Sequence, residues 1–337
     1  MTKEDILKDY LRPSQALIED MSKINGDILI LGAGGKMGPS MAKLATQAVK
    51  LSGIDKKVIA VSRFSDPAVV EDLKSHDVEV IKQDLLDEEG LDSLPKVANV
   101  IYMVGYKFGT TGNEPYTWIM NSYLPARVAQ KFNKSRIVVF SSGNVYPFSE
   151  VTHGGTDENI PAAPLGEYAQ SCLGRERMFQ YFSQKNHTPI LLYRLNYSND
   201  VSYGILLEIA RCVYEGRELN LSMGNVNVIW QKDANEIALR SLLHCEVPAK
   251  ILNVTGPETI SVRWVAHEFG KIFNKNVHFV SSEENTALLS NAAECFKLFG
   301  YPSVTLKQMI ELIAKWVIER GKTINKPTHF QERGGKY

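Results

Sequence analysis

The sequence predicts an α/β protein that is built on a doubly wound parallel sheet, with a smaller mixed α/β lobe towards the C-terminus. Short apolar runs alternate with helical segments over the first part of the chain, a pattern typical of parallel sheets covered by helices on both faces. The alternation loosens after about residue 196. The 337 residues are enough for one large or two ordinary domains.

We expect three parts. Residues 1–25 form a helical extension, residues 26–195 a dinucleotide-binding domain, and residues 196–337 a smaller substrate-binding lobe. The chain is expected to return to the large domain near 228–247. No internal repeat or low-complexity tract interrupts this plan.

The extension is predicted to be one short helix. In SQALIEDMSKI, residues 14–24, the side chains of Leu17, Ile18, Met21 and Ile24 share one helical face. Gly26 then ends the helix. An apolar face of this kind predicts packing against the main body of the protein.

Six apolar runs predict the strands of the large domain. Each is short and apolar on both faces, as expected for a strand inside a parallel sheet. The runs lie at 27–31, 58–61, 78–81, 100–104, 137–140 and 190–192.

A glycine-rich loop follows the first predicted strand, in DILILGAGGKMGPSMAKL. Gly32, Gly35 and Gly38 are spaced for a tight turn, for close approach of a pyrophosphate and for close helix packing. Pro39 suits the first turn of the following helix. Between a strand and a helix, the motif predicts a Rossmann-type dinucleotide site formed by Gly32, Gly35, Lys36, Met37 and Gly38.

The end of the second predicted strand bears on which dinucleotide is bound. An acidic residue there would hold the ribose 2′-hydroxyl of NAD. This chain has Ser62 and Arg63 instead, which suit a 2′-phosphate. We therefore expect NADP or NAD with a preference for NADP, and Asp66 is the residue that could reverse the preference.

The C-terminal part is predicted to mix helices and short strands. Helical patterns lie near 203–215, 233–243, 261–273 and 305–320, and strand patterns near 218–230, 251–254 and 277–280. We assign them to the smaller lobe, apart from the return near 228–247. In the first part of the chain, Pro125 interrupts a helical pattern and predicts a bend after Tyr123.

From about residue 27 to 320 the sequence resembles an extended short-chain dehydrogenase/reductase of the NAD-dependent epimerase/dehydratase family. The resemblance is carried by the glycine spacing and by QDLLD, NVIYMVGYK, VVFSSGNVYPF and NVTGPETISVRWVAHEFGKIF. It implies further cofactor contacts, from Asp84, Leu85, Val104, Gly105, Lys107 and Asn121.

The same resemblance implies that Tyr168 is the general acid/base and that Ser142 hydrogen-bonds the reacting oxygen. A tyrosine ionises near pH ~10 and needs a nearby cation to act as a base near neutrality. The family uses a lysine four residues after the tyrosine, and this chain has Cys172 there. Positions i and i+4 share a helical face, so a neutral thiol stands in the lysine's place.

Three interpretations of Cys172 stay open. Another cation, such as Lys107, Arg175 or the oxidised nicotinamide ring, replaces the lysine. Alternatively, Cys172 is itself a catalytic nucleophile or acid. In the third, Cys172 fills a small space and the protein binds a dinucleotide without fast redox chemistry.

The smaller lobe indicates a small polar substrate. Members of the resembled family that use nucleotide sugars usually have an arginine where NVNVIWQKDA stands here, so a nucleoside diphosphate would lack an obvious anchor. We expect a free sugar, a sugar acid or a related hydroxy compound. The candidate contacts are Asn144, Arg194, Asn196, Tyr197, Asn227 and Trp230, with Arg211 as a second candidate for binding a carboxylate.

Composition limits the partners. Lys plus Arg and Asp plus Glu both number 38, so nothing favours nucleic acid or an anionic membrane surface. The four cysteines are far apart and the seven histidines have no metal spacing. The N-terminus lacks the apolar run of a signal peptide. We expect a cytoplasmic protein without a metal. We also expect a homodimer, because members of the resembled family often pair through the helix within 113–132 and the helix that carries Tyr168.

Two functions are compatible with these observations. The first is an NAD(P)-dependent oxidoreductase or epimerase that acts on a carbohydrate or sugar-acid hydroxyl, with Tyr168 as acid/base. The second is a catalytically weak NAD(P)-binding sensor or regulatory protein with the same fold.

Overall fold

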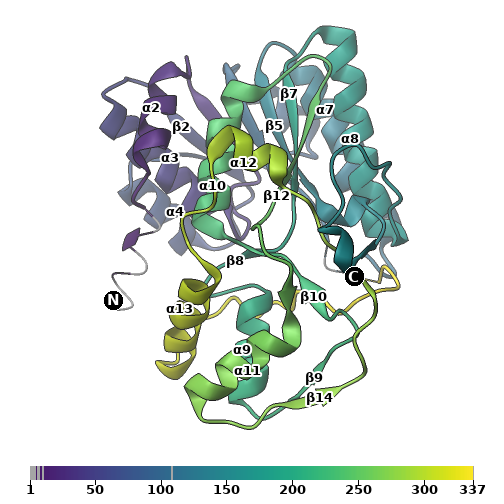
Figure 1. Ribbon diagram of the computed structural model, residues 1–337. Coiled ribbons are helices and arrows are strands. Elements are labelled where there is room, and N and C mark those ends of the chain that lie inside the picture. Colours follow the sequence, from purple (N-terminus) through teal and green to yellow (C-terminus); the bar gives the residue numbers. More distant parts are fainter. Residues whose placement is uncertain (1–4, 6–7, 10, 108, 337) are drawn as a thin grey trace.

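The computed structural model describes residues 5, 8–9, 11–107 and 109–336. Seven parallel strands form the central sheet in the order β12-β7-β5-β4-β1-β2-β3 (Figure 1). Their bounds are β1 Ile28–Leu31, β2 Val58–Ser62, β3 Glu79–Lys82, β4 Asn99–Tyr102, β5 Arg136–Ser142, β7 Ile190–Leu195 and β12 Lys250–Val254. The predicted doubly wound parallel sheet is confirmed, and the six expected strands are all in it.

The direction of winding reverses between β1 and β4. The chain runs outward from β1 to β2 and β3, and then from β4 to β5 and β7 on the other side. Ligands of open parallel sheets bind at the carboxyl ends of the strands at such a switch point. The glycine loop after β1 and the segment after β4 both lie there.

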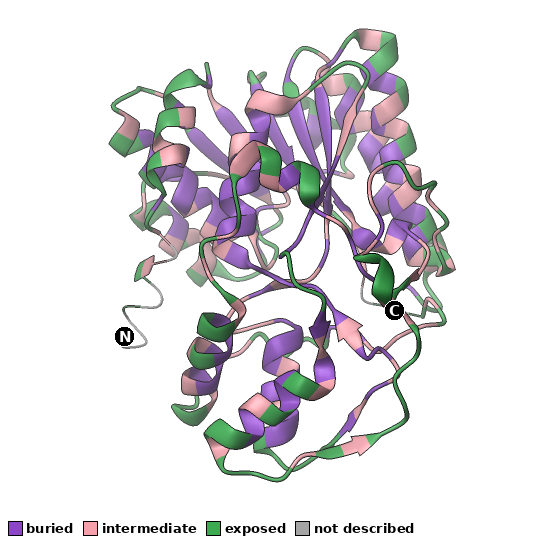
Figure 2. Ribbon diagram, in the orientation of Figure 1, coloured by how far each residue is buried: buried purple, intermediate pink, exposed green. Residues whose placement is uncertain are grey.

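Alternate residues of each strand face opposite layers of helices, as the period of two requires. Ile28 and Ile30 pack in one apolar cluster, and Leu29 and Leu31 in another. The first cluster includes residues of α2 Gln15–Lys23, α3 Gly38–Ser52, α4 Pro67–Ser75, α10 Gln231–Arg240 and α12 Ala293–Phe299. The second includes residues of α5 Glu88–Ser93, η1 Ile119–Tyr123, α7 Leu124–Lys131 and α8 Gly166–Asn186. Figure 2 shows the sheet buried between helices whose outer faces are exposed.

The N-terminal helix α2 docks on α3 through its apolar face. Leu17 and Met21 are fully buried, and Ile24 is almost so. The N-cap Ser14 accepts a hydrogen bond from the amide of Leu17, and its own amide donates to Glu236 of α10. The extension is therefore part of the large domain's packing.

The expected bend near Tyr123 is a change of helix type. A π-helical turn, η1, separates α6 Glu114–Trp118 from α7. Pro125 lies in the first turn of α7, where its missing amide hydrogen is least costly.

The smaller lobe surrounds a second core formed by three helices, α9 Ile205–Tyr214, α11 Val262–Phe273 and α13 Leu306–Ile318. Thr305 and Gln308 form a capping box at the start of α13. Short strands join in pairs: β8 Ser198–Asn199 with β11 Ile229–Trp230, β9 Glu218–Asn220 with β14 His278–Val280, β10 Asn225–Val226 with β13 Ile260–Ser261, and β6 Ser149–Glu150 with β15 Thr286–Ala287.

The assignment of 251–254 to the smaller lobe was wrong. That segment is β12, the edge strand of the large sheet, paired with β7. The chain also returns with α12, which packs on the large domain beside β12 and α10 (Figure 1). A buried edge strand and a short isolated strand have the same apolar pattern, so the sequence did not separate them.

The last part of the chain, residues 322–336, has no helix or strand and crosses between the two lobes; we call it the C-terminal strap. In Figure 1 it is the yellow trace that leaves α13 and ends beside the large domain. Its last residues contact the start of α8, where a Cβ on Gly166 would lie 2.2 Å from the carbonyl oxygen of Gly335. Within the described residues, none of the helices is long and apolar enough to cross a membrane.

Candidate functional site

The glycine loop makes a close turn at the switch point. Gly32 has a φ of +86°, and a Cβ there would lie 2.9 Å from the amide nitrogen of Val104. A Cβ on Gly38 would lie 2.3 Å from the carbonyl oxygen of Ala33. These two positions therefore require glycine, for the turn and for the approach of α3 to the loop.

Two adjoining cavities open from this loop. The first, of about 580 Å³, extends from the loop towards β2 and β3, and we call it the adenosine-side cavity. The second, of about 730 Å³, extends from the loop towards α8 and the smaller lobe, and we call it the reaction cavity. Gly32 and Gly35 line both, so the loop is at their junction.

Four predicted cofactor residues line the adenosine-side cavity beyond the loop: Ser62, Arg63, Asp84 and Leu85. The Arg63 guanidinium lies 4.0 Å from the Asp84 carboxylate, and both side chains are largely exposed. Asp66 also lines the cavity, but its carboxylate accepts a hydrogen bond from the amide of Ala68 and caps α4. Val104 and Gly105 complete the wall after β4.

Ser142, Asn144, Lys107 and Tyr168 line the reaction cavity. Ser142, at the end of β5, lies 2.9 Å from the Asn144 side chain through its Oγ. The Lys107 ammonium lies 5.5 Å from the centre of the Tyr168 ring. Burial lowers the pKa of Lys107 to about 8, so the side chain is still a cation at neutral pH.

Lys36 of the glycine loop also faces the reaction cavity. Its ammonium lies 3.2 Å from the centre of the Tyr203 ring, a cation–π contact between the loop and the smaller lobe. Burial, followed by repulsion from Lys107 and Lys326, lowers the pKa of Lys36 to about 7. Three lysines thus converge on one cavity.

Cys172 does not reach this cavity. Its side chain is fully buried on α8, in a cluster with Val145 and Tyr146. Burial raises the pKa of the thiol, and a contact with Tyr168 only partly offsets this. A buried, protonated thiol is a poor nucleophile, so we do not retain Cys172 as a catalytic residue.

Asn121 and Arg175 hold backbone segments next to the site and do not face the cavities. The Asn121 side chain binds the backbone N–H and C=O of Tyr106, at 2.8 Å each. Arg175 donates to Asn121 and to the carbonyl oxygen of Phe140. Neither lines the two cavities, and Asn121 orients the segment before Lys107 instead of facing the cofactor space.

Several predicted substrate contacts are also structural. Arg194 forms a bidentate, buried ion pair with Glu176 at 2.8 and 2.6 Å, so it has no free edge for a carboxylate. Trp230 is a core residue of the smaller lobe. Asn227 accepts from Asn196 and donates to the carbonyl oxygen of Ser290. Asn196 and Tyr197 do line the reaction cavity.

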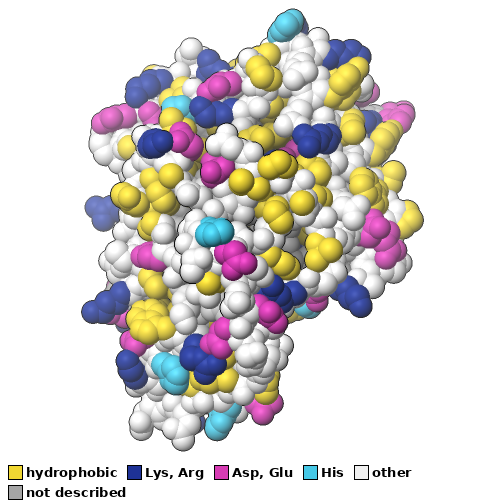
Figure 3. All heavy atoms as spheres, turned by 45° about the vertical axis from the view of Figure 1, so that its right-hand side comes forward, with side chains coloured by type: hydrophobic (Ala, Val, Ile, Leu, Met, Phe, Trp, Pro, Cys, Tyr) yellow, Lys and Arg dark blue, Asp and Glu magenta, His cyan; other side chains and the backbone are white. Residues whose placement is uncertain are grey.

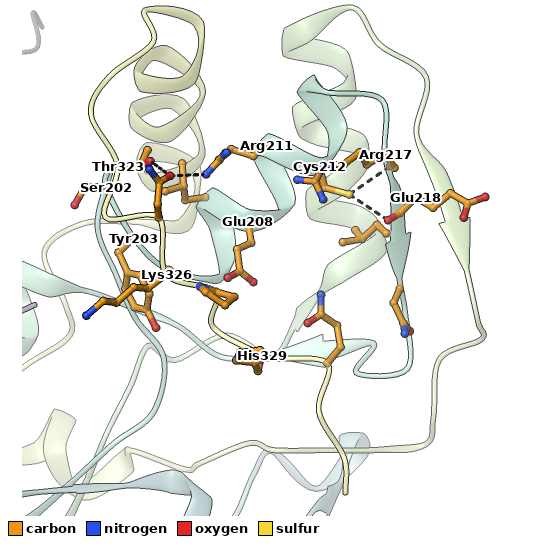
Figure 4. Close-up of a pocket in the computed structure, with 17 residues that line it drawn as sticks. Ser202, Tyr203, Glu208, Arg211, Cys212, Arg217, Glu218, Thr323, Lys326 and His329 are labelled. Atoms are coloured by element: carbon orange, nitrogen blue, oxygen red, sulfur yellow. Dashed lines mark hydrogen bonds between the residues drawn. The ribbon is translucent and has the colours of Figure 1, made fainter. Parts of the chain in front are cut away.

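Arg211 lines a third cavity, of about 510 Å³, within the smaller lobe (Figure 4). We call this the side cavity. Arg211 lies 3.4 Å from Glu215 and 3.3 Å from Asn325 of the C-terminal strap. It is therefore separated from the reaction cavity by the strap.

The loop, the two cavities and the switch point form a Rossmann-type site, and a comparison with protein families agrees with it. The model of the NAD dependent epimerase/dehydratase family matches residues 28–225. The chain belongs to the NAD-dependent epimerase/dehydratase family.

Solved structures agree with the fold of this family. UDP-glucuronic acid 4-epimerase from Bacillus cereus, solved with NAD, is 16% identical with a TM-score of 0.71, over 88% of this chain and 100% of that one. The UDP-Glc/GlcNAc 4-epimerase from Campylobacter jejuni is 19% identical with a TM-score of 0.71, over the same shares. dTDP-glucose 4,6-dehydratase from Bacillus anthracis, with NAD, is 16% identical with a TM-score of 0.73, over 88% and 97%. A comparison with curated proteins gave no match.

Tyr203 and Lys326 also line the reaction cavity, and neither was predicted from the sequence as a site residue. Tyr203 precedes α9 and holds Lys36, and Lys326 lies in the C-terminal strap. Neither had a recognisable motif or period, because each lies in an irregular segment. In the described part of the chain, no cluster of His, Cys, Asp and Glu could hold a metal ion.

Proposed function

We propose that this protein is an NAD(P)-dependent oxidoreductase or epimerase that acts at a hydroxyl of a sugar or sugar acid, with Tyr168 as its acid/base. The observation that carries the proposal is that Tyr168, Ser142 and Lys107 line the same cavity as the glycine loop. A phenol, a hydroxyl donor and a cation beside the glycine loop are groups that can move and stabilise a proton during hydride transfer at a hydroxyl-bearing carbon.

The cavities fit a dinucleotide. They meet at the glycine loop, so a two-nucleotide ligand would place one half in each and its diphosphate at the loop. Gly35 leaves room for that approach, because a Cβ there would meet only the carbonyl oxygen of Gly32, at 3.4 Å. A bound nicotinamide cofactor would supply the hydride acceptor and donor for this chemistry.

Residues of this chain would transfer the proton of the substrate hydroxyl and stabilise the phenolate that transfers it. Tyr168 takes the hydroxyl proton in the oxidative direction and returns it in the reductive one, while Ser142 Oγ orients the reacting oxygen. Lys107 favours the phenolate of Tyr168 by charge, which is the task of the lysine that Cys172 replaces. Of the two side-chain cations expected there, Lys107 is preferred because Arg175 is engaged by Asn121 and Phe140.

The substrate that we favour is a carbohydrate without a bulky charged anchor. The names of the similar structures describe enzymes of nucleotide sugars. In this chain, the polar side chains of Asn144, Asn196 and Tyr197 line the reaction cavity together with Tyr168. A carboxylate on the substrate would meet a lysine of the reaction cavity, since Arg194 and Arg211 are engaged elsewhere.

Turnover with a panel of sugars and sugar acids, measured with NAD and with NADP, tests this function. Replacing Tyr168 with Phe removes one hydroxyl and should lower kcat by about 10²–10⁴-fold, the usual worth of a general acid/base. Dinucleotide affinity should be unchanged. Tyr181→Phe is the matched control, because Tyr181 lies on the same helix with its side chain exposed.

A catalytically weak dinucleotide sensor is the second candidate, and the buried thiol at position 172 favours it. Tight dinucleotide binding without turnover on any sugar would support the sensor. Equal turnover of the wild type and Tyr168→Phe would remove Tyr168 from the mechanism.

We further propose a preference for NADP over NAD. Arg63 is exposed at the adenosine-side cavity, where a 2′-phosphate could meet its guanidinium. Arg63→Ala should weaken NADP binding by about ten- to a hundredfold, in line with about 1.5–3 kcal/mol for a hydrogen bond to a charged group. NAD affinity should change little, and calorimetric titration of both coenzymes checks this. An equal loss for both would contradict a role in 2′-phosphate recognition.

We also propose a homodimer. Exposed aromatic and aliphatic side chains gather on α6, η1 and α8, which pack together: Trp118, Ile119, Tyr123 and Tyr181. Figure 3 shows hydrophobic side chains on the surface among charges of both signs. Exposed apolar groups on neighbouring helices are typical of a self-association surface.

A further inference from the structure

The C-terminal strap is fixed at several points along its length. The amide of Ile324 donates to the carbonyl oxygen of Ser202 at 3.0 Å, and the Thr328 hydroxyl donates to Glu208 at 2.7 Å. Phe330 is buried in the core of the smaller lobe. Arg333 donates to the carbonyl oxygen of Thr286 at 2.8 Å. Anchors at 324 and 328 therefore hold the backbone on both sides of Lys326.

The anchored strap is a wall between two cavities. Residues on one side of it line the side cavity: Thr323, Asn325, Pro327, His329 and Gln331. Ile324 and Thr328 line the reaction cavity, and Lys326 lines both. The segment from Ile324 to Thr328 therefore faces the site, and three of its residues line the reaction cavity: Ile324, Lys326 and Thr328.

Lys326 also lies at the glycine loop, where the adenosine-side cavity and the reaction cavity meet. Eight residues line both the adenosine-side cavity and the reaction cavity, among those that the structure describes: Gly32, Gly34, Gly35, Asp66, Val69, Met103, Gly105 and Lys326. Seven of them lie between residues 32 and 105. In this set Lys326 alone is a cation, and it comes from the far end of the chain.

The diphosphate is the middle of a dinucleotide, so it would occupy the junction of the two cavities. We propose that Lys326 binds the diphosphate from the side opposite the glycine loop. This inference rests on the proposed dinucleotide binding and adds a residue to it. The strap thereby supplies a full positive charge, which the backbone N–H groups of the loop lack.

The other two lysines of the reaction cavity are directed elsewhere. The Lys36 ammonium lies against the Tyr203 ring and that of Lys107 lies beside Tyr168. Asp66 is the anion at the junction, and its carboxylate is occupied by the amide of Ala68. Figure 4 shows Lys326 beside Tyr203 with its ammonium directed away from the side cavity.

Titration calorimetry with ADP-ribose and with adenosine tests the proposal, because adenosine lacks the diphosphate and the second ribose of ADP-ribose and neither ligand needs turnover. Lys326→Gln should weaken ADP-ribose binding by about tenfold, as expected for a charge-assisted contact, and leave adenosine binding unchanged. Lys326→Arg should retain most of the affinity. Lys322→Gln, in the same strap and equally exposed, is the control that should bind both ligands as the wild type does.

Acetylation of surface lysines, followed by mass spectrometry, gives a second measurement on the unaltered protein. ADP-ribose should protect Lys326 from the reagent and leave Lys322 reactive. Wild-type affinity in Lys326→Gln, or equal losses for ADP-ribose and adenosine, would overturn the role of Lys326 alone. Failure of the wild type to bind ADP-ribose, NAD or NADP would instead overturn the proposed function.

Discussion

Lys107 combines two properties that seldom occur together in one side chain. It is drawn into a cavity, where burial lowers its pKa to about 8, and it lies beside the phenol whose ionisation it would favour. Its position after β4 is held by Asn121, which binds both backbone polar groups of Tyr106. A cation supplied from a loop can therefore replace one supplied from α8, where Cys172 is too short and too deeply buried.

The pH dependence of turnover follows from this arrangement. Below about pH 8 Lys107 is charged and favours the phenolate of Tyr168; above it the amine is neutral and that help is lost. We expect kcat to fall on the alkaline side of about pH 8. Lys107→Arg keeps its charge to pH ~12 and should remove this alkaline fall, whereas Lys107→Met should lower kcat by roughly ten- to a hundredfold at neutral pH.

Stability gives a readout of Lys107 that does not depend on turnover. The folded pKa of about 8 lies below the ordinary 10.5, so the folded state disfavours the charged form. The penalty is present in full below pH 8 and disappears above the ordinary pKa. Lys107→Met should therefore raise the melting temperature of the ligand-free protein at pH 6 and have little effect near pH ~11. A pH-independent effect would contradict a buried charge at this position.

Elements with strong local signals could be predicted from the sequence. The first strand and the helix after it were recognised because a buried apolar run, a glycine loop and a proline at the helix start occur in immediate succession. The apolar face of α2 followed from its period of about 3.6 residues. Each of these signals is local, so no knowledge of the tertiary structure was needed.

Elements defined by distant partners could not be predicted. β12 is an edge strand because it pairs with β7, about 60 residues earlier in the chain, and its own sequence does not encode that partner. Arg194 looked like an anion-binding residue, but Glu176 on α8 neutralises it inside the core. The C-terminal strap is the extreme case, because its backbone is fixed by Ser202, Glu208 and Thr286 and has no period of its own.

At the scale of the molecule, the chain after β7 passes repeatedly between the two lobes. It enters the smaller lobe, returns with α10 and β12, returns again with α12, and finally crosses the cleft as the strap. The walls of the reaction cavity therefore come from both ends of the sequence, residues 32–39 and 324–328. Any loss of the strap should affect the site directly, without a change in the sheet.

Self-association is the prediction that concerns the whole assembly. Trp118 on α6, Tyr123 on η1 and Tyr181 on α8 have exposed side chains. A stable dimer buries about 800 Å² on each partner, and exposed aromatic residues contribute most of the binding energy at such surfaces. Sedimentation equilibrium should give twice the mass of the chain. Tyr181→Glu places a charge on this surface and should shift the protein to the monomer. Leu51→Glu, equally exposed but on α3 across the sheet, should not, and a monomer at all concentrations of the wild type would contradict the dimer.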